Sequence, residues 1–314
     1  MKLKKPKFWD FKKPNFLSFL LLIFTVPLLL NNFFLNLKNK KKIINLRTIC
    51  IGNIYLGGTG KTPTTIELYK ILKKQNYNVS TAKKFYKSQE DEQNLLKKET
   101  DLICYDTRKS IIHKAIHEKK EVLIFDDGLQ DKNITYDMQF VCFDSNTWIG
   151  NGQLIPAGPL REKISSLKKY DGVFLKNSKN KYYNEILKNI NSRIEIFNTE
   201  YQISNLNQFN LNFDYMIFSG IGNPNDFKNI LVENKFNIKD ELIYPDHFNY
   251  TLKDIEFIKK RANDINAGII TTEKDYMRIK KENRNGINFL KINLKIHDEK
   301  RLINFINDNI NDKS

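Results

Sequence analysis

Downstream of residue 43 the chain alternates between short apolar runs and longer stretches with helical spacing. The short runs are rich in β-branched and aromatic side chains, which is typical of buried strands. In the longer stretches apolar side chains recur every three or four positions, as on one face of a helix. This alternation predicts an α/β fold, a mostly parallel sheet with helices on both faces. The expected strands are Ile43–Ile51, Val122–Phe125, Phe140–Phe143 and Gly172–Leu175, and the expected helices include Thr62–Lys74 and Ser110–Glu118.

A polar, irregular stretch at residues 198–214 interrupts this pattern, and a second alternating stretch follows it. We therefore expect a core domain at residues 41–210 and a smaller α/β carboxy-terminal domain at residues 211–314. The elements expected in the second domain are strands Tyr215–Ser219, Gly268–Thr271 and Ile287–Ile292 and helices Asn225–Glu233, Leu252–Asn263 and Glu299–Asn309.

The first 40 residues follow another pattern, a long apolar segment between lysine-rich flanks. The run Phe16–Leu30 contains no charged residue, and apolar side chains resume after two asparagines as far as Leu37. A helix over Phe16–Leu37 is just long enough to cross about 30 Å of hydrocarbon. A buried core helix is the alternative, but lysines on both sides favour anionic headgroups. Residues 1–40 are thus predicted to form an N-terminal membrane helix that anchors the protein, either spanning the bilayer or lying in its surface.

Composition excludes several classes of protein. With 314 residues, of which 40% are hydrophobic, the chain can bury a sizeable core and is not a disordered protein. Its three widely spaced cysteines form neither a disulfide framework nor a paired-cysteine zinc pattern. The net charge is +16, but +10 of it lies in residues 1–47. The positive charge therefore marks the anchor, and we expect no nucleic-acid partner.

A glycine-rich segment between the first expected strand and the first expected helix is the sharpest motif. Its glycines let backbone N–H groups turn inward around phosphate oxygens, and the helix N-terminus adds a positive dipole end. Lys61 would reach the β- and γ-phosphates, and the Thr62 hydroxyl would bind Mg²⁺. The standard loop has a further glycine where this chain has Tyr55. We expect ATP and Mg²⁺ to bind at Gly57, Gly58, Thr59, Gly60, Lys61 and Thr62.

Two further motifs belong beside that loop. The run VLIFDDGLQD ends a buried strand in adjacent carboxylates, so Asp126 or Asp127 would hold the metal or its waters. Two adjacent acids are costly to bury without a cation. The run IGNGQLIPAGPLRE is rich in glycine and proline and forms an ordered loop. In it Arg161 would bind a phosphate and Glu162 would bind Mg²⁺, although a surface ion pair explains this pair of residues equally well.

Six blocks of the chain together resemble one family. In order they read GNIYLGGTGKTP, DDGLQ, GNGQLIPAGPLRE, SGIGNPNDF, YPDHF and TTEKD, within residues 51–275. This order is similar to the signature of the tetraacyldisaccharide 4′-kinases, the lipid A 4′-kinases, whose phosphate loop also lacks the glycine at position 55. The resemblance implies a P-loop NTPase-like fold and transfer of the ATP γ-phosphoryl group to the 4′-hydroxyl of a tetraacylated glucosamine disaccharide 1-phosphate. It also implies that the enzyme acts at the cytoplasmic face of the inner membrane, and we expect no obligate protein partner.

The resemblance also suggests which groups activate the acceptor hydroxyl. The family has a GDEP block after the first helix, and the matching stretch here is EDEQ, which leaves Asp91 as the expected general base. The family's DH pair matches Asp246 and His247, which would support Asp91 from the second domain. Lys61 completes the expected catalytic group.

Besides the change of GDEP to EDEQ, the chain departs from the family at two places. Asp131 stands where members usually have a histidine, and the glycine-rich SRGYG loop before the GDEP block is absent. Our hypothesis is that lysines in its place contact the lipid's phosphate: Lys83, Lys84 and Lys87. Two other classes of function stay open from the residues alone, a membrane-associated P-loop ATPase that drives a partner and a degenerate kinase that binds nucleotide without catalysis.

Overall fold

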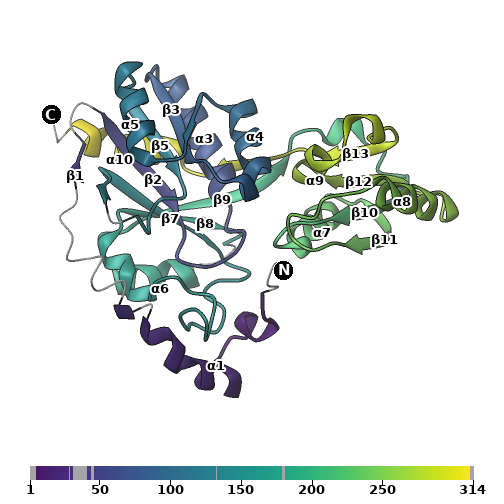
Figure 1. The fold of residues 1–314 in the computed structure, drawn as a ribbon, viewed down its shortest axis with the longest axis horizontal. Coiled ribbons are helices and arrows are strands. Elements are labelled where there is room, and N and C mark those ends of the chain that lie inside the picture. Colours follow the sequence, from purple (N-terminus) through teal and green to yellow (C-terminus); the bar gives the residue numbers. More distant parts are fainter. Residues whose placement is uncertain are drawn as a thin grey trace. The chain divides into compact units, whose positions relative to one another are not determined.

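The computed structural model describes residues 5–27, 29–30, 41–43, 46–131, 133–178 and 181–311. The chain forms two compact units, one made of Met1–Glu200 with Lys295–Ser314 and the other of Tyr201–Leu294. Each unit contains a parallel β-sheet covered by helices (Figure 1). The predicted α/β class with mostly parallel strands is therefore confirmed.

An eight-stranded sheet forms the centre of the first unit. The strand order is β14-β9-β8-β7-β2-β5-β3-β4, and all neighbouring pairs from β9 to β4 are parallel. Parallel neighbours end at the same edge, so the segments that follow β2, β5 and β3 meet there. The strands are β2 (Arg47–Gly52), β3 (Val79–Lys84), β4 (Leu102–Tyr105), β5 (Val122–Asp126), β7 (Met138–Asp144), β8 (Gly172–Lys176), β9 (Glu195–Ile203) and β14 (Ile292–Ile296).

Helices cover both faces of this sheet. Ala115 of α5 and Leu187 of α6 join a core cluster on one face, which also contains Val141 of β7. Phe140 precedes Val141 and so points to the other face, where Phe305 of α10 packs edge-on against it at 6.2 Å between ring centroids. The helices of this unit are α1 (Phe16–Leu21), α3 (Lys61–Lys74), α4 (Glu90–Glu99), α5 (Arg108–His117), α6 (Tyr182–Ile190) and α10 (Glu299–Asn311).

The second unit has its own four-stranded parallel sheet, in the order β11-β10-β12-β13. One face packs on α8 through residues such as Ile258, and the other packs on α7 through residues such as Leu231. The elements are β10 (Asp214–Ser219), α7 (Pro224–Glu233), β11 (Asn237–Ile243), α8 (Leu252–Asp264), β12 (Gly268–Thr272), α9 (Glu273–Arg278) and β13 (Ile287–Leu290).

Short elements complete the described chain. Two-residue strands β1 (Lys41–Lys42) and β6 (Ile134–Thr135) pair in parallel as a separate sheet. The 3₁₀ helices are η1 (Lys7–Asp10), η2 (Leu22–Thr25), η3 (Lys87–Gln89), η4 (Ile164–Lys169), η5 (Leu206–Gln208) and η6 (Lys281–Asn283).

The division between the units differs from the one expected at residue 210. The chain leaves the first unit after Glu200, and its last stretch, Lys295–Ser314, returns to that unit instead of staying with residues 211–314. The reason is that the expected strand Ile287–Ile292 is two strands, β13 in the small sheet and β14 in the large one. Helix α10 then packs on the large sheet, as its fully buried Leu302 and Ile306 require.

The amino-terminal segment also differs from the continuous helix expected at Phe16–Leu37. The structure has α1 over Phe16–Leu21 and then η2, while residues 28 and 31–37 of that prediction lie outside the described residues. Among the described residues, no helix is long and apolar enough to cross a membrane. Apolar side chains of this segment are nevertheless exposed, Phe16 by 80% and Ile23 by 74%.

The loop that follows β7 holds this segment on the first unit. The buried Trp9 side chain donates a hydrogen bond from Nε1 to the Pro156 carbonyl at 3.0 Å. Asn151 donates its backbone N–H to the Trp9 carbonyl at 3.0 Å and its side chain to Ser18 Oγ at 2.9 Å. A side chain at Gly150 would meet the Trp9 carbonyl oxygen at 2.2 Å, so this close approach requires glycine.

Candidate active site

The glycine-rich loop connects β2 to α3, the position that the sequence predicts. Gly60 precedes the helix at φ +86°, a left-handed conformation that glycine adopts without strain. The loop then tightens through a hydrogen bond from the Thr59 N–H to the Gly57 carbonyl at 3.0 Å. Because α3 begins at Lys61, the free N–H groups of its first turn face the loop, which suits an anion.

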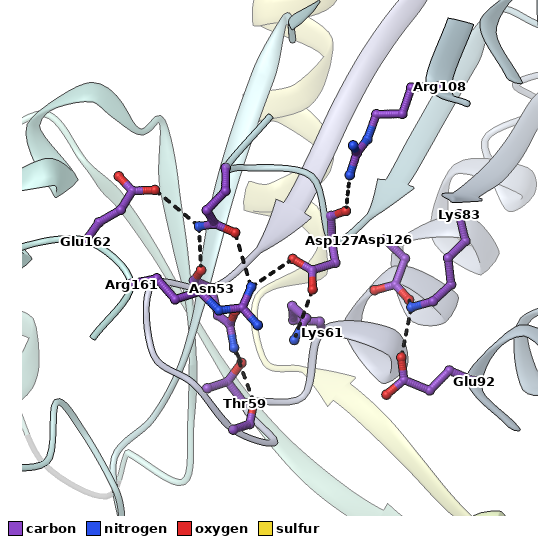
Figure 2. Close-up of polar contacts among 12 residues, drawn as sticks. Asn53, Thr59, Lys61, Lys83, Glu92, Arg108, Asp126, Asp127, Arg161 and Glu162 are labelled. Carbon is purple, nitrogen blue, oxygen red and sulfur yellow. Dashed lines mark hydrogen bonds and ion pairs between the residues drawn. The ribbon is translucent and has the colours of Figure 1, made fainter. Parts of the chain in front are cut away.

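A residue that the sequence analysis missed braces this loop from inside. The buried Asn53 side chain donates from Nδ2 to the Gly57 carbonyl at 3.2 Å and to Thr59 Oγ1 at 3.0 Å (Figure 2). Its position directly after a buried strand and before the glycines was the available signal. Asn53 therefore fixes the shape of the loop independently of any ligand.

The loop with the expected phosphate-binding arginine lies directly against the glycine-rich loop. Leu56 donates its N–H to the Pro159 carbonyl at 2.8 Å, and Arg161 donates its N–H to the Ile54 carbonyl at 2.7 Å. Tyr55, which replaces the usual glycine, forms an isolated antiparallel bridge with Leu160 between these two contacts. This pairing brings Arg161 to the nucleotide loop although the two segments are far apart in the sequence.

Asp126 ends β5 beside the nucleotide loop and is buried, with 2% of its surface exposed. Its Oδ2 accepts a hydrogen bond from Thr62 Oγ1 at 3.0 Å. Its Oδ1 is buried and has no hydrogen-bond partner among the described residues. Mg²⁺ prefers hard oxygen ligands, and the Asp126 carboxylate and the Thr62 hydroxyl place such oxygens side by side. The predicted pair Thr62 and Asp126 thus comes together and fits the metal.

Asp127 turns away from its neighbour and contacts two cations. It has φ +66°, an uncommon conformation for a residue other than glycine. Its carboxylate lies 3.8 Å from Lys61 Nζ and 3.5 Å from Arg161 Nη1 (Figure 2). Arg108 Nη2 donates to the Asp127 carbonyl at 2.8 Å and so supports this conformation. Asp127 therefore holds in place the two side chains that the sequence analysis expects to bind phosphate.

Arg108 binds Asp131, the residue at one of the places where the chain departs from the family. Its Nη1 donates to Asp131 Oδ2 at 2.7 Å, and both side chains are largely buried. Asp131, which replaces the usual histidine, thereby fixes the arginine that supports Asp127. The sequence analysis did not identify Arg108, because nothing local links it to the acid pair.

Glu162, the other predicted metal ligand, is buried within hydrogen bonds. Tyr170 donates its hydroxyl to Glu162 Oε1 at 3.0 Å, and Gln130 Nε2 donates to the same oxygen at 3.1 Å. Lys169 pairs with Oε2. Burial and the nearby Glu162 raise the pKa of Tyr170, so its phenol stays protonated and donates. Gln130 also donates to the Asn53 carbonyl at 3.0 Å, which links Glu162 to the loop.

Asp126, which accepts a hydrogen bond from Thr62, also pairs with Lys83 of β3. The hypothesis that Lys83 contacts the lipid's phosphate stays a prediction: its side chain is only 3% exposed, but it lines the cavity that also contains Asp126. Its Nζ lies 2.7 Å from Asp126 Oδ2 and 2.8 Å from Glu92 Oε2. Burial lowers the pKa of Lys83, but Asp126 and Glu92 outweigh burial and hold it above its usual value. The expected base, Asp91, precedes Glu92 in the first turn of α4.

A cavity of about 420 Å³ opens beside these groups. Its walls bring together the acid pair after β5 with basic side chains from β3, α5 and the loop before η4. This mixture of fixed cations and carboxylates suits a phosphate accompanied by a metal ion. The lining residues are Lys83, Lys84, Tyr86, Gln89, Arg108, Asp126, Asp127, Gly128, Gln130, Asp131, Asn133 and Arg161.

Asp246 and His247 lie in the second unit, before α8. His247 has φ +57°, donates its N–H to the Gly220 carbonyl at 3.0 Å, and has its Nδ1 3.3 Å from Arg278 Nη2. Asp246 Oδ1 is 3.9 Å from His247 Nε2. Arg278 in turn pairs with the fully buried Asp275 at 2.9 Å. The two blocks that sequence analysis noted as YPDHF and TTEKD are thus parts of one network.

Comparison with known proteins agrees with this geometry. The model of the family LpxK, tetraacyldisaccharide-1-P 4′-kinase, matches residues 15–311. The chain belongs to this family. A tetraacyldisaccharide 4′-kinase of Pelagibacter ubique is 47% identical over 97% of each chain, and one of Rickettsia canadensis is 34% identical over 91% of each.

The fold agrees as well. A crystal structure of the apo form of LpxK from Aquifex aeolicus in complex with ATP has a TM-score of 0.70, with 20% identity, and covers 94% of this chain and 99% of its own. The resemblance found in the six sequence blocks is therefore confirmed, and the chain is a kinase of the tetraacyldisaccharide 4′-kinase family.

Proposed function

We propose that this chain transfers the γ-phosphoryl group of ATP to the 4′-hydroxyl of a tetraacyl glucosamine disaccharide 1-phosphate. The observation that carries the proposal is the contact between Thr62 and Asp126 at the glycine-rich loop, beside a cavity with basic walls. Family membership supplies the acceptor, because the relatives are named for this substrate.

The residues of the loop divide the work of holding the triphosphate. The N–H groups around Gly58 and Gly60 would surround the β-phosphate, and Lys61 would compensate the negative charge on the γ-phosphate. Thr62 and Asp126 would hold Mg²⁺, with Asp127 or Glu162 completing the site. Mg²⁺ held there would neutralise the negative charge that develops on the phosphoryl group during transfer.

For the acceptor we propose Asp91 as general base. A sugar hydroxyl is a poor nucleophile at neutral pH, so a carboxylate within hydrogen-bond reach would accept its proton. What supports Asp91 is its place in the first turn of α4, next to Glu92, which is linked through Lys83 to Asp126. The pair Asp246 and His247 would act from the second unit.

We further propose that the protein works at the inner membrane, with both units on the cytoplasmic side. The support is the exposed apolar surface of residues 16–27 and 29–30, next to lysines such as Lys12 and Lys13. The acceptor is an anionic lipid, so an enzyme held at the surface meets it without extracting it. Membrane surface and lipid acceptor are the partners that this proposal requires.

The test is the release of ADP by purified protein with Mg²⁺ and ATP, measured with and without the disaccharide 1-phosphate in detergent. A kinase that excludes water releases ADP at least tenfold faster with the acceptor, an order-of-magnitude expectation from site closure. Equal rates would indicate an ATPase instead. ATP binding without ADP release under either condition would indicate a degenerate kinase, and both results would contradict the proposal.

A further inference from the structure

The buried ion network around Lys83 is not explained by nucleotide binding alone. A lysine with 3% of its side chain exposed is expensive to bury, and the tie to two carboxylates offsets that cost. One of them, Asp126, belongs to the nucleotide side of the site through Thr62. The other, Glu92, belongs to α4. A single ammonium group thus connects the end of one strand to the start of a helix (Figure 2).

Helix α4 depends on this connection at its first turn. Its N-cap residue, Gln89, makes no side-chain hydrogen bond to the helix, so the usual capping contact is absent there. A second contact at this end comes from Gln93 Nε2, which donates to the Tyr86 carbonyl at 2.6 Å and holds α4 to the preceding segment. The contact from Lys83 to Glu92 instead holds the helix to β3, and through Asp126 to β5.

The sequence around β3 gives this connection a reason. Lys83 and Lys84 end the strand, and Phe85 and Tyr86 follow them in a stretch that contains no glycine. Strand β3 continues through Lys84, and Lys83 lines the cavity together with Asp126. Its two contacts span the distance from the metal carboxylate to the helix of the expected base.

We infer that Lys83 is a positioning residue for phosphoryl transfer: it fixes the first turn of α4, with Asp91, relative to Asp126 and the bound triphosphate. This inference rests on the proposed function, in which Asp91 accepts the acceptor's proton. The contact from Lys83 to Glu92 therefore acts on the chemical step and not on ATP affinity. Displacing a reacting group by about 1 Å can lower a rate about 10²-fold.

The decisive variant is Glu92→Gln, because it removes the charge that pairs α4 with Lys83 and leaves Lys83 paired with Asp126. We expect kcat to fall about 10- to 100-fold, with KM for ATP changed less than about threefold. Lys83→Met should lower kcat at least as much, and the double variant should be no slower than the worse single one, since both break one link. Lys83→Arg, which keeps the charge, should recover part of the rate.

Hydrogen exchange supplies a readout that does not require turnover. In Glu92→Gln and Lys83→Met the amides of α4 should exchange faster, while those of β5 and α3 keep their protection. Lys97→Met, an exposed lysine on the same helix, is the matched control and should match the wild type in both measurements.

The two measurements separate the possible failures. Unchanged kcat together with unchanged exchange in Glu92→Gln would overturn the inference, and so would a large rise in KM for ATP with kcat preserved. If Lys83→Met fails to fold, Glu92→Gln still decides. If the wild type does not phosphorylate the lipid, the proposed function fails, yet faster α4 exchange in the variants would still support the tie.

Discussion

Asp126 is the centre of the site at the scale of residues. One of its oxygens accepts from Thr62 and pairs with Lys83, and the other is buried without a partner among the described residues. The sequence allowed prediction of Thr62 and Asp126, because each belongs to a local motif at the end of a strand. The ion pairs of Lys83 with Asp126 and Glu92 could not be predicted. They depend on β3 lying next to β5, which no local sequence pattern encodes.

Replacing Lys61 tests the loop's main cation. Lys61→Ala should lower kcat about 10³-fold, because charge on the γ-phosphate loses its fixed partner. Steady-state kinetics with the lipid acceptor measure this, and Lys74→Ala, an exposed lysine on the same helix, should leave kcat unchanged. A Lys61→Ala enzyme within about tenfold of the wild type would remove this lysine from the mechanism.

At the scale of elements, two segments without catalytic side chains shape the nucleotide site. The loop of residues 53–60 keeps its form through Asn53, and the loop of residues 149–161 pairs with it along the backbone. Most strands and helices were predictable from their apolar spacing. Strand β3 was not, since its buried positions include Ser80, Thr81 and Lys83, whose polar side chains obscure the pattern. Helix α10 was predicted as a helix, but the unit on which it packs was not.

Asn53→Ala should loosen the nucleotide loop without unfolding the protein. Two hydrogen bonds at about 1 kcal/mol each are lost, so ATP affinity should fall about tenfold or more. Titration with a fluorescent ATP analogue measures the dissociation constant, with Asn94→Ala on the exposed surface of α4 as control. An unchanged dissociation constant would show that the loop keeps its form without Asn53.

Helix α10 should stabilise the large sheet although it follows the second unit in the chain. Ile306→Ala removes a fully buried side chain and should lower the free energy of unfolding by about 2–5 kcal/mol. Urea denaturation, monitored by hydrogen exchange in β7 and β9, measures this loss of stability. The control is Lys300→Ala on the exposed face of α10. A loss confined to the second unit would contradict the assignment of α10.

At the scale of the whole molecule, the first unit carries both the nucleotide site and the segment proposed to face lipid. The loop after β7 links them, because Asn151 holds the amino-terminal segment and Arg161, farther along the same loop, reaches the nucleotide loop. Composition and the lysine flanks predicted a membrane-facing segment. They could not predict that Trp9 is buried against this loop, because that contact joins distant parts of the chain.

The exposed apolar side chains of this segment should be required for membrane binding. A variant with Phe16→Asp, Phe19→Asp and Ile23→Asp should lose at least about tenfold in binding to anionic vesicles, measured by co-sedimentation, and stay folded. The control places the same charges at exposed apolar positions of the second unit, Ile243→Asp, Leu252→Asp and Phe257→Asp. Equal loss in both variants, or none in the first, would refute the proposed surface.

The lipid product tests the proposed phosphoryl transfer most directly. Purified protein should be incubated with ATP, Mg²⁺ and the disaccharide 1-phosphate, and the lipid analysed by mass spectrometry and by phosphorus NMR. We predict one added phosphate on the 4′-oxygen with the wild type and none with Lys61→Ala. A folded wild-type protein that binds ATP and leaves the lipid's mass unchanged, or that places the phosphate on another oxygen, would contradict the account.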